Sequence, residues 1–131
     1  MASIPDSHKA LIGAPNLVAL ATVQPDGQPQ VTPVWADVED GLVRVNTAAG
    51  RHKHSNMIER PQVTVLAIDP QNGQRYIEVR GKVVRHSEEN GDAVIDKFAK
   101  DYLDADSYPF RNAAETRVTF YIEPTHVVTQ G

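Results

Sequence analysis

The basic segment from Arg51 to Arg60 is the part of this sequence best suited to bind an anion. It concentrates arginine, lysine and histidine in a chain whose formal net charge is −4. The small-residue turn Thr47–Gly50 precedes it, and a helix that starts after such a turn points free N–H groups and its positive dipole end at a ligand. Arginine can bind phosphate through two hydrogen bonds, and lysine adds a point charge. The segment predicts a phosphate-type site, although a solvated basic surface fits the same residues equally well.

The remaining chemical groups form no recognisable catalytic or metal-binding motif. His52 and His54 are two residues apart, so they share a face on a strand and diverge on a helix, and no carboxylate cluster lies beside them. We interpret them as solvated histidines and expect no metal site. The sequence has no cysteine, no G-x-S-x-G motif, and neither of the glycine-rich nucleotide-binding motifs. Thiolate chemistry is excluded, and a serine hydrolase is disfavoured.

The composition indicates one globular domain spanning residues 1–131. Hydrophobic residues make up 40% and charged residues 23%, which is typical of a protein with an ordinary apolar core. The negative net charge argues against a nucleic-acid partner. The longest strongly apolar stretch, Leu17–Val23, is far shorter than the roughly 20 residues of a membrane span, and no secretory pattern precedes it. We therefore expect a cytoplasmic protein with neither a nucleic-acid nor a membrane partner.

The first half of the chain predicts a short helix and three antiparallel strands. The helix is expected between Ser3 and Gly13, with Pro5 in its first turn. Turn residues at 25–27 and 40–41 join the strands as hairpins. The strands are expected at Leu17–Val23, Gln28–Val38 and Leu42–Thr47.

The second half predicts two helices and the remaining strands. Residues 51–60 suit a few helical turns that end before Pro61, and an apolar stripe from Ala93 to Leu103 predicts a longer helix. Gly81 indicates a bulge or a close backbone approach, and Pro124 is expected to break the last strand. Strands are expected at Gln62–Asp69, Gln74–Arg85, Thr116–Ile122 and, as a short piece, His126–Thr129. These elements predict a mainly β protein, a six-stranded antiparallel barrel with peripheral helices.

Three sequence segments carry a family resemblance that covers residues 8 to 126. They are the hairpin ATVQPDGQPQVTPVW, the set Arg51, Lys53, Asn56, Pro61 and Val63, and the strand RYIEVRGKV. In these segments the chain resembles the pyridoxamine 5′-phosphate oxidase-like superfamily, whose fold is the FMN-binding split β-barrel. Within it, the chain is most similar to the small reductases that use the deazaflavin coenzyme F420.

The resemblance implies a homodimer with the cofactor in a groove between the two barrels. The residues that match the wall beside the ring system are Thr32, Pro33, Val34, Trp35, Asn46, Thr47 and Ala48. The residues that match the phosphate or tail contacts are Arg51, Lys53 and Asn56. A core or interface position would suit Trp35 as well as a cofactor contact. The second subunit is expected to contribute from the strand at 74–85 or from the loop near Tyr108–Arg111.

The resemblance also implies an oxidoreductase in which reduced F420 passes hydride to a small conjugated acceptor. The cofactor carries that chemistry and the protein binds and orients it, so we assign no catalytic residue. The long anionic tail of F420 fits the basic segment, whereas FMN needs a single phosphate pocket. An FMN-dependent oxidase or flavin reductase of the same fold is one alternative. A non-catalytic carrier of a flavin-like or haem-like ligand is another.

Overall fold

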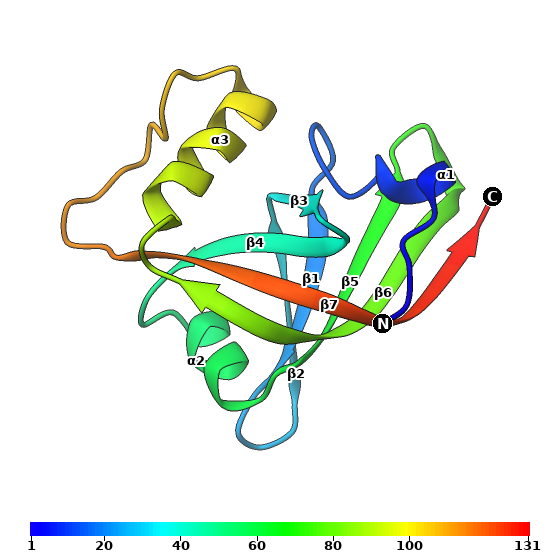
Figure 1. Ribbon diagram of the computed structural model, residues 1–131, viewed down its shortest axis with the longest axis horizontal. Coiled ribbons are helices and arrows are strands. Elements are labelled where there is room, and N and C mark those ends of the chain that lie inside the picture. The colour runs from blue at the N-terminus through cyan, green and yellow to red at the C-terminus, as the bar shows by residue number, and fades with distance from the viewer.

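The computed structural model describes residues 1–131, which form seven strands and three helices. Ten elements follow one another along the chain, and Figure 1 labels them. They are α1 (Asp6–Lys9), β1 (Val18–Val23), β2 (Pro29–Val34), β3 (Ala36–Glu39), β4 (Leu42–Ala48), α2 (His52–Glu59), β5 (Gln62–Asp69), β6 (Asn72–Ser87), α3 (Gly91–Leu103) and β7 (Arg117–Gln130).

The strands form one antiparallel sheet in the order β2-β1-β5-β6-β7-β4-β3. Its two edge strands, β2 and β3, are consecutive in sequence and are separated only by Trp35. Because one residue joins the two edges, the sheet must curl until they meet, which confirms the mainly β split barrel (Figure 1). The expected single strand at 28–38 turns at Trp35 from pairing with β1 to pairing with β4. The structure therefore has seven strands and not six.

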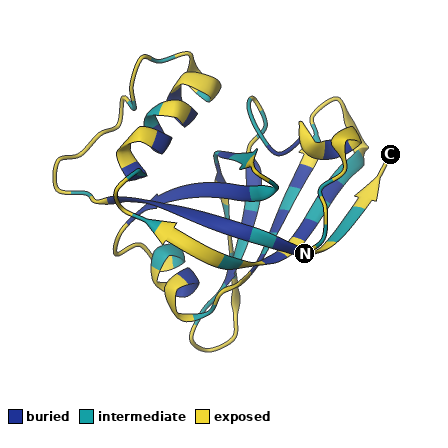
Figure 2. Ribbon diagram, viewed as in Figure 1, coloured by how far each residue is buried: buried dark blue, intermediate teal, exposed yellow.

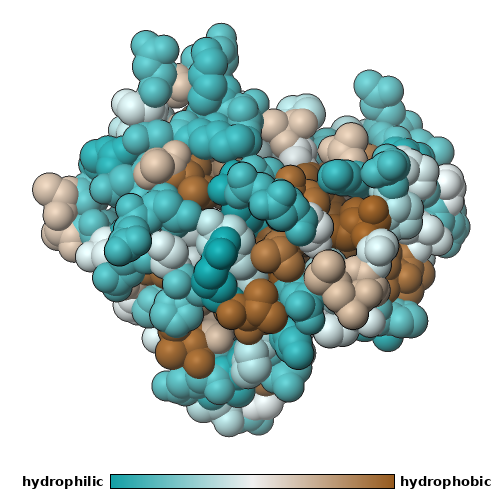
Figure 3. All heavy atoms as spheres, in the orientation of Figure 1, coloured by the Kyte–Doolittle hydropathy of each residue, from teal (hydrophilic) through white to brown (hydrophobic).

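The core fills the inside of this curled sheet. Alternate residues of the strands point inward, as Val18 and Leu20 of β1 do, and join a cluster of 17 buried hydrophobic residues. Strand β4 is buried on both faces because α3 covers its outer side with Val94, Ile95 and Phe98 (Figure 2). The outer face of α3 carries mainly hydrophilic side chains (Figure 3), which is the amphipathic pattern that the sequence predicts.

Strand β7 runs through Pro124 without a break, so the prediction of two separate strands is wrong. Proline cannot donate a ladder hydrogen bond, but it is tolerated at a bulge. The β6–β7 register shifts there, with Arg80 opposite His126 and Gly81 opposite Pro124, which leaves Thr125 as the extra residue. The close approach predicted at Gly81 is confirmed, since a Cβ atom would lie 2.5 Å from the carbonyl oxygen of Glu123.

The helices are peripheral. The first, α1, is shorter than predicted: it spans Asp6–Lys9, although turns continue toward Gly13. Helix α2 ends at Arg60, whose extended backbone is the conformation expected before a proline. None of the helices has the length and apolar composition required to cross a membrane.

Replacing Gly81 by alanine should destabilise the barrel. The new methyl group would meet backbone atoms of Glu123, which cannot move away as a side chain could. We expect Gly81→Ala to lower the free energy of unfolding by roughly 1–3 kcal/mol in urea titrations. Gly73→Ala, in the same strand and with open space around its Cβ, serves as the control and should change little. Equal midpoints for the two variants would contradict the close approach.

Candidate functional site

A cavity of about 210 Å³ lies where the ends of β2 and β4 meet α2, α3 and the start of β7. Seven of the ten residues predicted from sequence line it, and they come from three separate parts of the chain. The full lining is Leu17, Pro33, Val34, Trp35, Asn46, Thr47, Arg51, Lys53, Ile95, Phe98, Tyr108, Phe110 and Arg117. The cavity is smaller than the roughly 300–1,000 Å³ typical of ligand sites, so one chain encloses only part of a cofactor-sized molecule.

The apolar wall of the cavity is built around Trp35. Its indole stacks on Tyr102, with ring centroids 5.3 Å apart, and the edge of Tyr108 meets it at 6.2 Å. The Tyr102 hydroxyl donates to the carbonyl oxygen of Asn16 at 2.7 Å, which fixes the stack against the barrel. Trp35 is thus a packed aromatic residue that also lines the cavity, and its contact with a cofactor stays a prediction.

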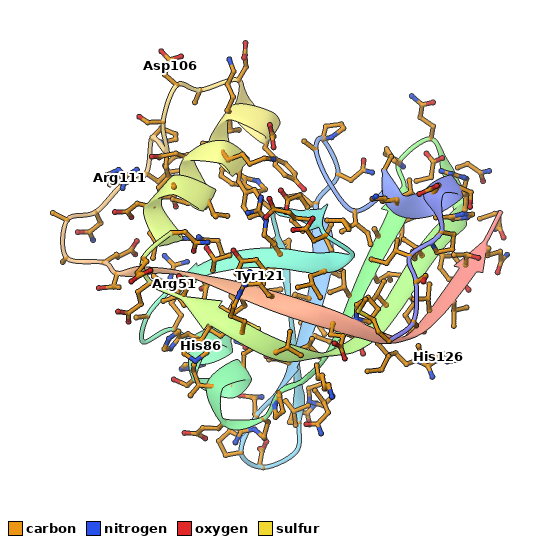
Figure 4. All side chains as sticks on the ribbon, in the orientation of Figure 1. Arg51, His86, Asp106, Arg111, Tyr121 and His126 are labelled. Atoms are coloured by element: carbon orange, nitrogen blue, oxygen red, sulfur yellow. The ribbon has the colours of Figure 1, made fainter.

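Three cationic side chains also line the cavity. Arg51, which precedes α2, and Lys53 in its first turn face the cavity together with Arg117, the first residue of β7. The register of β4 and β7 places Ala48 opposite Arg117, which brings this arginine to the turn before Arg51. Figure 4 shows Arg51 at the end of the barrel where the loop after α3 enters β7.

One carboxylate, Glu115, forms ion pairs with two of these cations, Arg51 and Arg117. Its oxygens lie 3.0 Å from Arg51 and 3.4 Å from Arg117, and the hydrogen bond from Arg51 lowers the pKa of the Glu115 carboxyl. Lys53 makes no ion pair. Burial lowers the pKa of its amine, and the charges of Arg51 and Arg117 lower it further. The local field is therefore positive, as an anion site requires.

Polar groups from β4 complete the floor of the cavity. Asn46 is buried; its amide donates to the carbonyl oxygen of Gly91 at 2.9 Å and accepts a hydrogen bond from Arg117 Nε at 2.9 Å. It thus holds the start of α3 and the guanidinium of Arg117 in place. The neighbouring Thr47 differs, because its buried hydroxyl oxygen has no hydrogen-bond partner in the protein.

Three of the predicted site residues lie outside the cavity lining. Thr32 is on the inward face of β2, and its buried hydroxyl also has no partner. Ala48 is buried in the β4–β7 ladder. Asn56 is 3% exposed, and its amide donates to Thr22 Oγ1 at 3.0 Å and to Gln30 at 3.3 Å, so it ties α2 to β1 and β2.

The two histidines of α2 diverge, as expected on a helix. His52 is exposed, whereas His54 is half-buried with its ring edge-on to Phe120 at 5.7 Å. Burial lowers the pKa of the His54 imidazole. No group of three or more His, Cys, Asp or Glu side chains is placed to hold a metal ion.

Sequence reasoning missed several residues of the cavity. Arg117 begins a strand far from the basic segment, and only the β4–β7 pairing brings it there. Ile95 and Phe98 belong to the apolar stripe of α3, which indicated packing and not a binding wall. Tyr108 and Phe110, expected to serve a second subunit, line the cavity of their own chain.

A second, larger groove of about 660 Å³ adjoins the cavity on the outer face of the sheet. Ala19 and Ala21 of β1 and Val31 of β2 line the groove. Leu17 and Pro33, which lie on the same face of the sheet, line the cavity. The groove is mainly apolar, and Val31 at its border is 63% exposed. Its residues are Ala19, Ala21, Val31, Thr64, Leu66, Ile68, Gly73, Tyr76, Glu78, Arg80 and Val128. The cavity therefore opens onto an exposed apolar surface.

The unpaired charge of Lys53 should cost folding stability. Since the amine has a lower pKa in the folded state, its protonation favours the unfolded state at pH values below that pKa. We expect Lys53→Met to raise the free energy of unfolding at pH 7 by up to about 1 kcal/mol, the range of a charge still in contact with water. The gain should shrink as the pH rises toward 10, where the lysine becomes neutral.

Lys9→Met, at an exposed lysine without an ion pair, is the matched control for this measurement. It should leave the free energy of unfolding almost unchanged across the same pH range. If the higher free energy of unfolding of Lys53→Met persists unchanged at high pH, apolar packing explains the gain and the charge of Lys53 does not.

Comparisons with known proteins agree with this geometry. The family model named pyridoxamine 5′-phosphate oxidase matches residues 4–131. A solved structure named F420 reductase is 31% identical, with a TM-score of 0.83, and the match covers 95% of this chain and 98% of that one. A conserved hypothetical protein from Mycobacterium tuberculosis (21% identical, TM-score 0.75, covering 97% and 84%) shares the fold. So does HupZ of Group A Streptococcus (18%, 0.70, 96% and 93%). Among curated proteins, none matches the chain.

The family match covers nearly the whole chain, and the 31% identical structure extends over almost the full length of both proteins. Both agree with the split barrel and with the resemblance carried by the sequence motifs. The chain belongs to the pyridoxamine 5′-phosphate oxidase family and is related to the F420 reductases.

Proposed function

We propose that this protein is an F420-dependent oxidoreductase that transfers hydride from reduced F420 to a small conjugated acceptor. The observation that carries the proposal is the cavity itself, whose lining brings three cations, Arg51, Lys53 and Arg117, together with the aromatic side chains of Trp35, Phe98 and Tyr108. The relationship to a protein named F420 reductase supports the choice of cofactor.

In this proposal the three cations hold the phosphate and the anionic tail. Arg51 is half-exposed, so its guanidinium can turn toward a ligand, and Lys53 is a cation that no carboxylate neutralises. Arg117 joins them as a third donor, held in place by Asn46. The first N–H groups of α2 lack a side-chain cap and add donors on the same side. Asn56 supports α2 from behind.

The apolar part of the lining seats the ring system. Pro33, Val34 and Trp35 form its wall, and β2 is an edge strand with backbone groups unpaired on its free side. Asn46 and Thr47 at the end of β4 line the cavity beside this wall. Thr32 and Ala48 do not line the cavity. They adjoin Pro33 and Thr47 in the same two strand ends.

When bound, the reduced deazaflavin supplies the hydride. The residues of this chain bind the cofactor, orient it against Trp35 and exclude water with Phe98, Tyr108 and Phe110. Reduction of a conjugated acceptor also consumes a proton. The phenol of Tyr108 and the ammonium of Lys53 are the cavity groups able to donate one, and water is the third source.

The assembly we propose is a homodimer formed through the apolar groove of β1, β5 and β6. The groove exposes apolar side chains to water, and it continues along β1 and β2 into the cavity. A second copy seated there would cover the groove and enlarge a site that one chain encloses only in part.

The cofactor proposal predicts that Arg51→Ala and Lys53→Ala each weaken F420 binding by roughly ten- to a hundredfold. Each removes a charge-assisted hydrogen bond that contributes about 1.5–3 kcal/mol. The loss should become smaller as salt is raised, because screening already weakens the wild-type attraction. Fluorescence titration with F420 measures the binding constants, and urea titration confirms that both variants are folded.

Arg85→Ala and Lys9→Ala are the matched controls, because both side chains are exposed and neither lines the cavity. Wild-type affinity in Arg51→Ala and Lys53→Ala would show that the basic segment is a solvated surface. FMN binding at least tenfold tighter than F420 would replace the proposal with the FMN-dependent alternative. Tight F420 binding without hydride transfer to any quinone, nitroaromatic or unsaturated ketone would favour the alternative of a non-catalytic ligand carrier.

The assembly proposal predicts a particle of twice the 14.4 kDa chain mass at micromolar concentration. Leu66→Asp places a charge in the groove and should give monomers by sedimentation, with weaker F420 binding. Val84→Asp alters an exposed apolar residue of β6 outside the groove and should remain dimeric. A stable wild-type monomer would contradict the shared groove.

A further inference from the structure

Glu115 is the one carboxylate that contacts the cavity's cations. Its Oε1 accepts a hydrogen bond from Arg51 Nη2 at 3.0 Å, and its Oε2 accepts a longer one from Arg117 Nη1 at 3.4 Å. The side chain is 24% exposed and does not itself line the cavity. Glu115 instead lines a neighbouring cavity of about 120 Å³ together with Arg117, so it contacts the two arginines from outside the candidate site.

A carboxylate in this position acts on a bound anion in two ways. It occupies guanidinium N–H groups that a phosphate would otherwise use. It also repels the anion in proportion to the anion's own charge, because the Coulomb energy is a product of two charges. A doubly charged phosphate is therefore penalised about twice as strongly as a singly charged one.

We propose, on the basis of the function proposed above, that Glu115 selects the charge of the phosphate group that the cavity accepts. Its charge offsets part of the attraction exerted by Arg51, Lys53 and Arg117, and this offset is about twice as large for a doubly charged phosphomonoester as for a singly charged phosphodiester. The phosphate of F420 is a diester, whereas that of FMN is a terminal monoester whose second proton leaves near pH 6. Glu115 is thus a specificity-determining residue that acts through Arg51 and Arg117, without contact with the reacting atoms.

The charges around Glu115 allow this selection to be followed by pH. Arg51 and Lys53 of α2 and Arg117 of β7 face it from the cavity side. Asp92 and Arg111, which pair with each other at 3.1 Å, lie on its other side. Because Arg51 lowers the pKa of the Glu115 carboxyl, that group is still charged at pH 5.5, where a phosphomonoester has regained its second proton.

The test compares two probes that differ only in phosphate charge. One is the deazaflavin ribityl 5′-phosphate, which is F420 cut back to its phosphomonoester, and the other is the methyl ester of that phosphate. At pH 7.5, Glu115→Gln should increase the affinity for the monoester roughly three- to tenfold more than the affinity for the methyl ester. At pH 5.5 the difference between the two probes should become much smaller, because most of the monoester then carries one charge. Variant and wild type are compared at each pH, so every other charged group is the same in both proteins.

Two further variants separate charge from structure. Glu115→Asp keeps the carboxylate and should retain the discrimination against the monoester. Glu59→Gln makes the same chemical change at an exposed residue of α2 and should alter neither probe. An equal response of both probes to Glu115→Gln at pH 7.5 would show that Glu115 only positions the loop, and would overturn the inference.

The outcome for F420 itself distinguishes this inference from the function on which it rests. If wild-type protein fails to bind F420, the proposed function fails, and the inference fails with it. If F420 binds and neither fragment does, the arginines do not hold the phosphate, and the inference alone is wrong.

Discussion

The hydrogen bond between Arg117 and Asn46 is the contact on which the candidate site depends. It joins the first residue of β7 to the end of β4, and the same Asn46 amide reaches the carbonyl oxygen of Gly91 at the start of α3. Arg117 is 7% exposed, and the ring of Tyr108 lies 5.2 Å from its guanidinium carbon. The buried amide of Asn46 in β4 thus holds the start of β7, the start of α3 and the guanidinium of Arg117 in place. A buried arginine would be costly without such partners, because its charge has left water.

The crowding of cations has a second consequence, which concerns stability. Arg51, Lys53 and Arg117 repel one another, and Glu115 pairs with only the two arginines. The pKa of the Lys53 amine is lowered mainly by burial and further by the charges of Arg51 and Arg117. A bound anion would supply the missing counter-charge. In the proposed function, binding of the anion would relieve this unfavourable field, so that the site would trade stability for affinity. The carboxylate of Glu115 sets how much of that field is left for the ligand.

The hairpins and the mainly β fold could be predicted because their signals are local. Turn residues, alternating apolar positions and the helical stripe from Ala93 to Leu103 each act within a few residues. Arg51 and Lys53 were found for the same reason, as neighbours in a basic segment. Arg117 and Glu115 were not, because strand pairing brings them to that segment from more than 60 residues away. Asn56 is a different case. The motif suggested a phosphate or tail contact, but its amide donates hydrogen bonds to Thr22 and Gln30 instead of facing the cavity.

The seventh strand and the cavity have a common origin in Trp35. At this residue the chain leaves the edge of β1 and joins the edge of β4, so its backbone cannot continue either ladder. The closure of the barrel therefore leaves a corner, and the aromatic stack of Trp35 on Tyr102 fills one side of it. The other side is the cavity, whose polar floor is the end of β4. A sheet that closes through a single residue leaves its cavity at the point of closure, which explains why the end of β2, Trp35 and the end of β4 line it together.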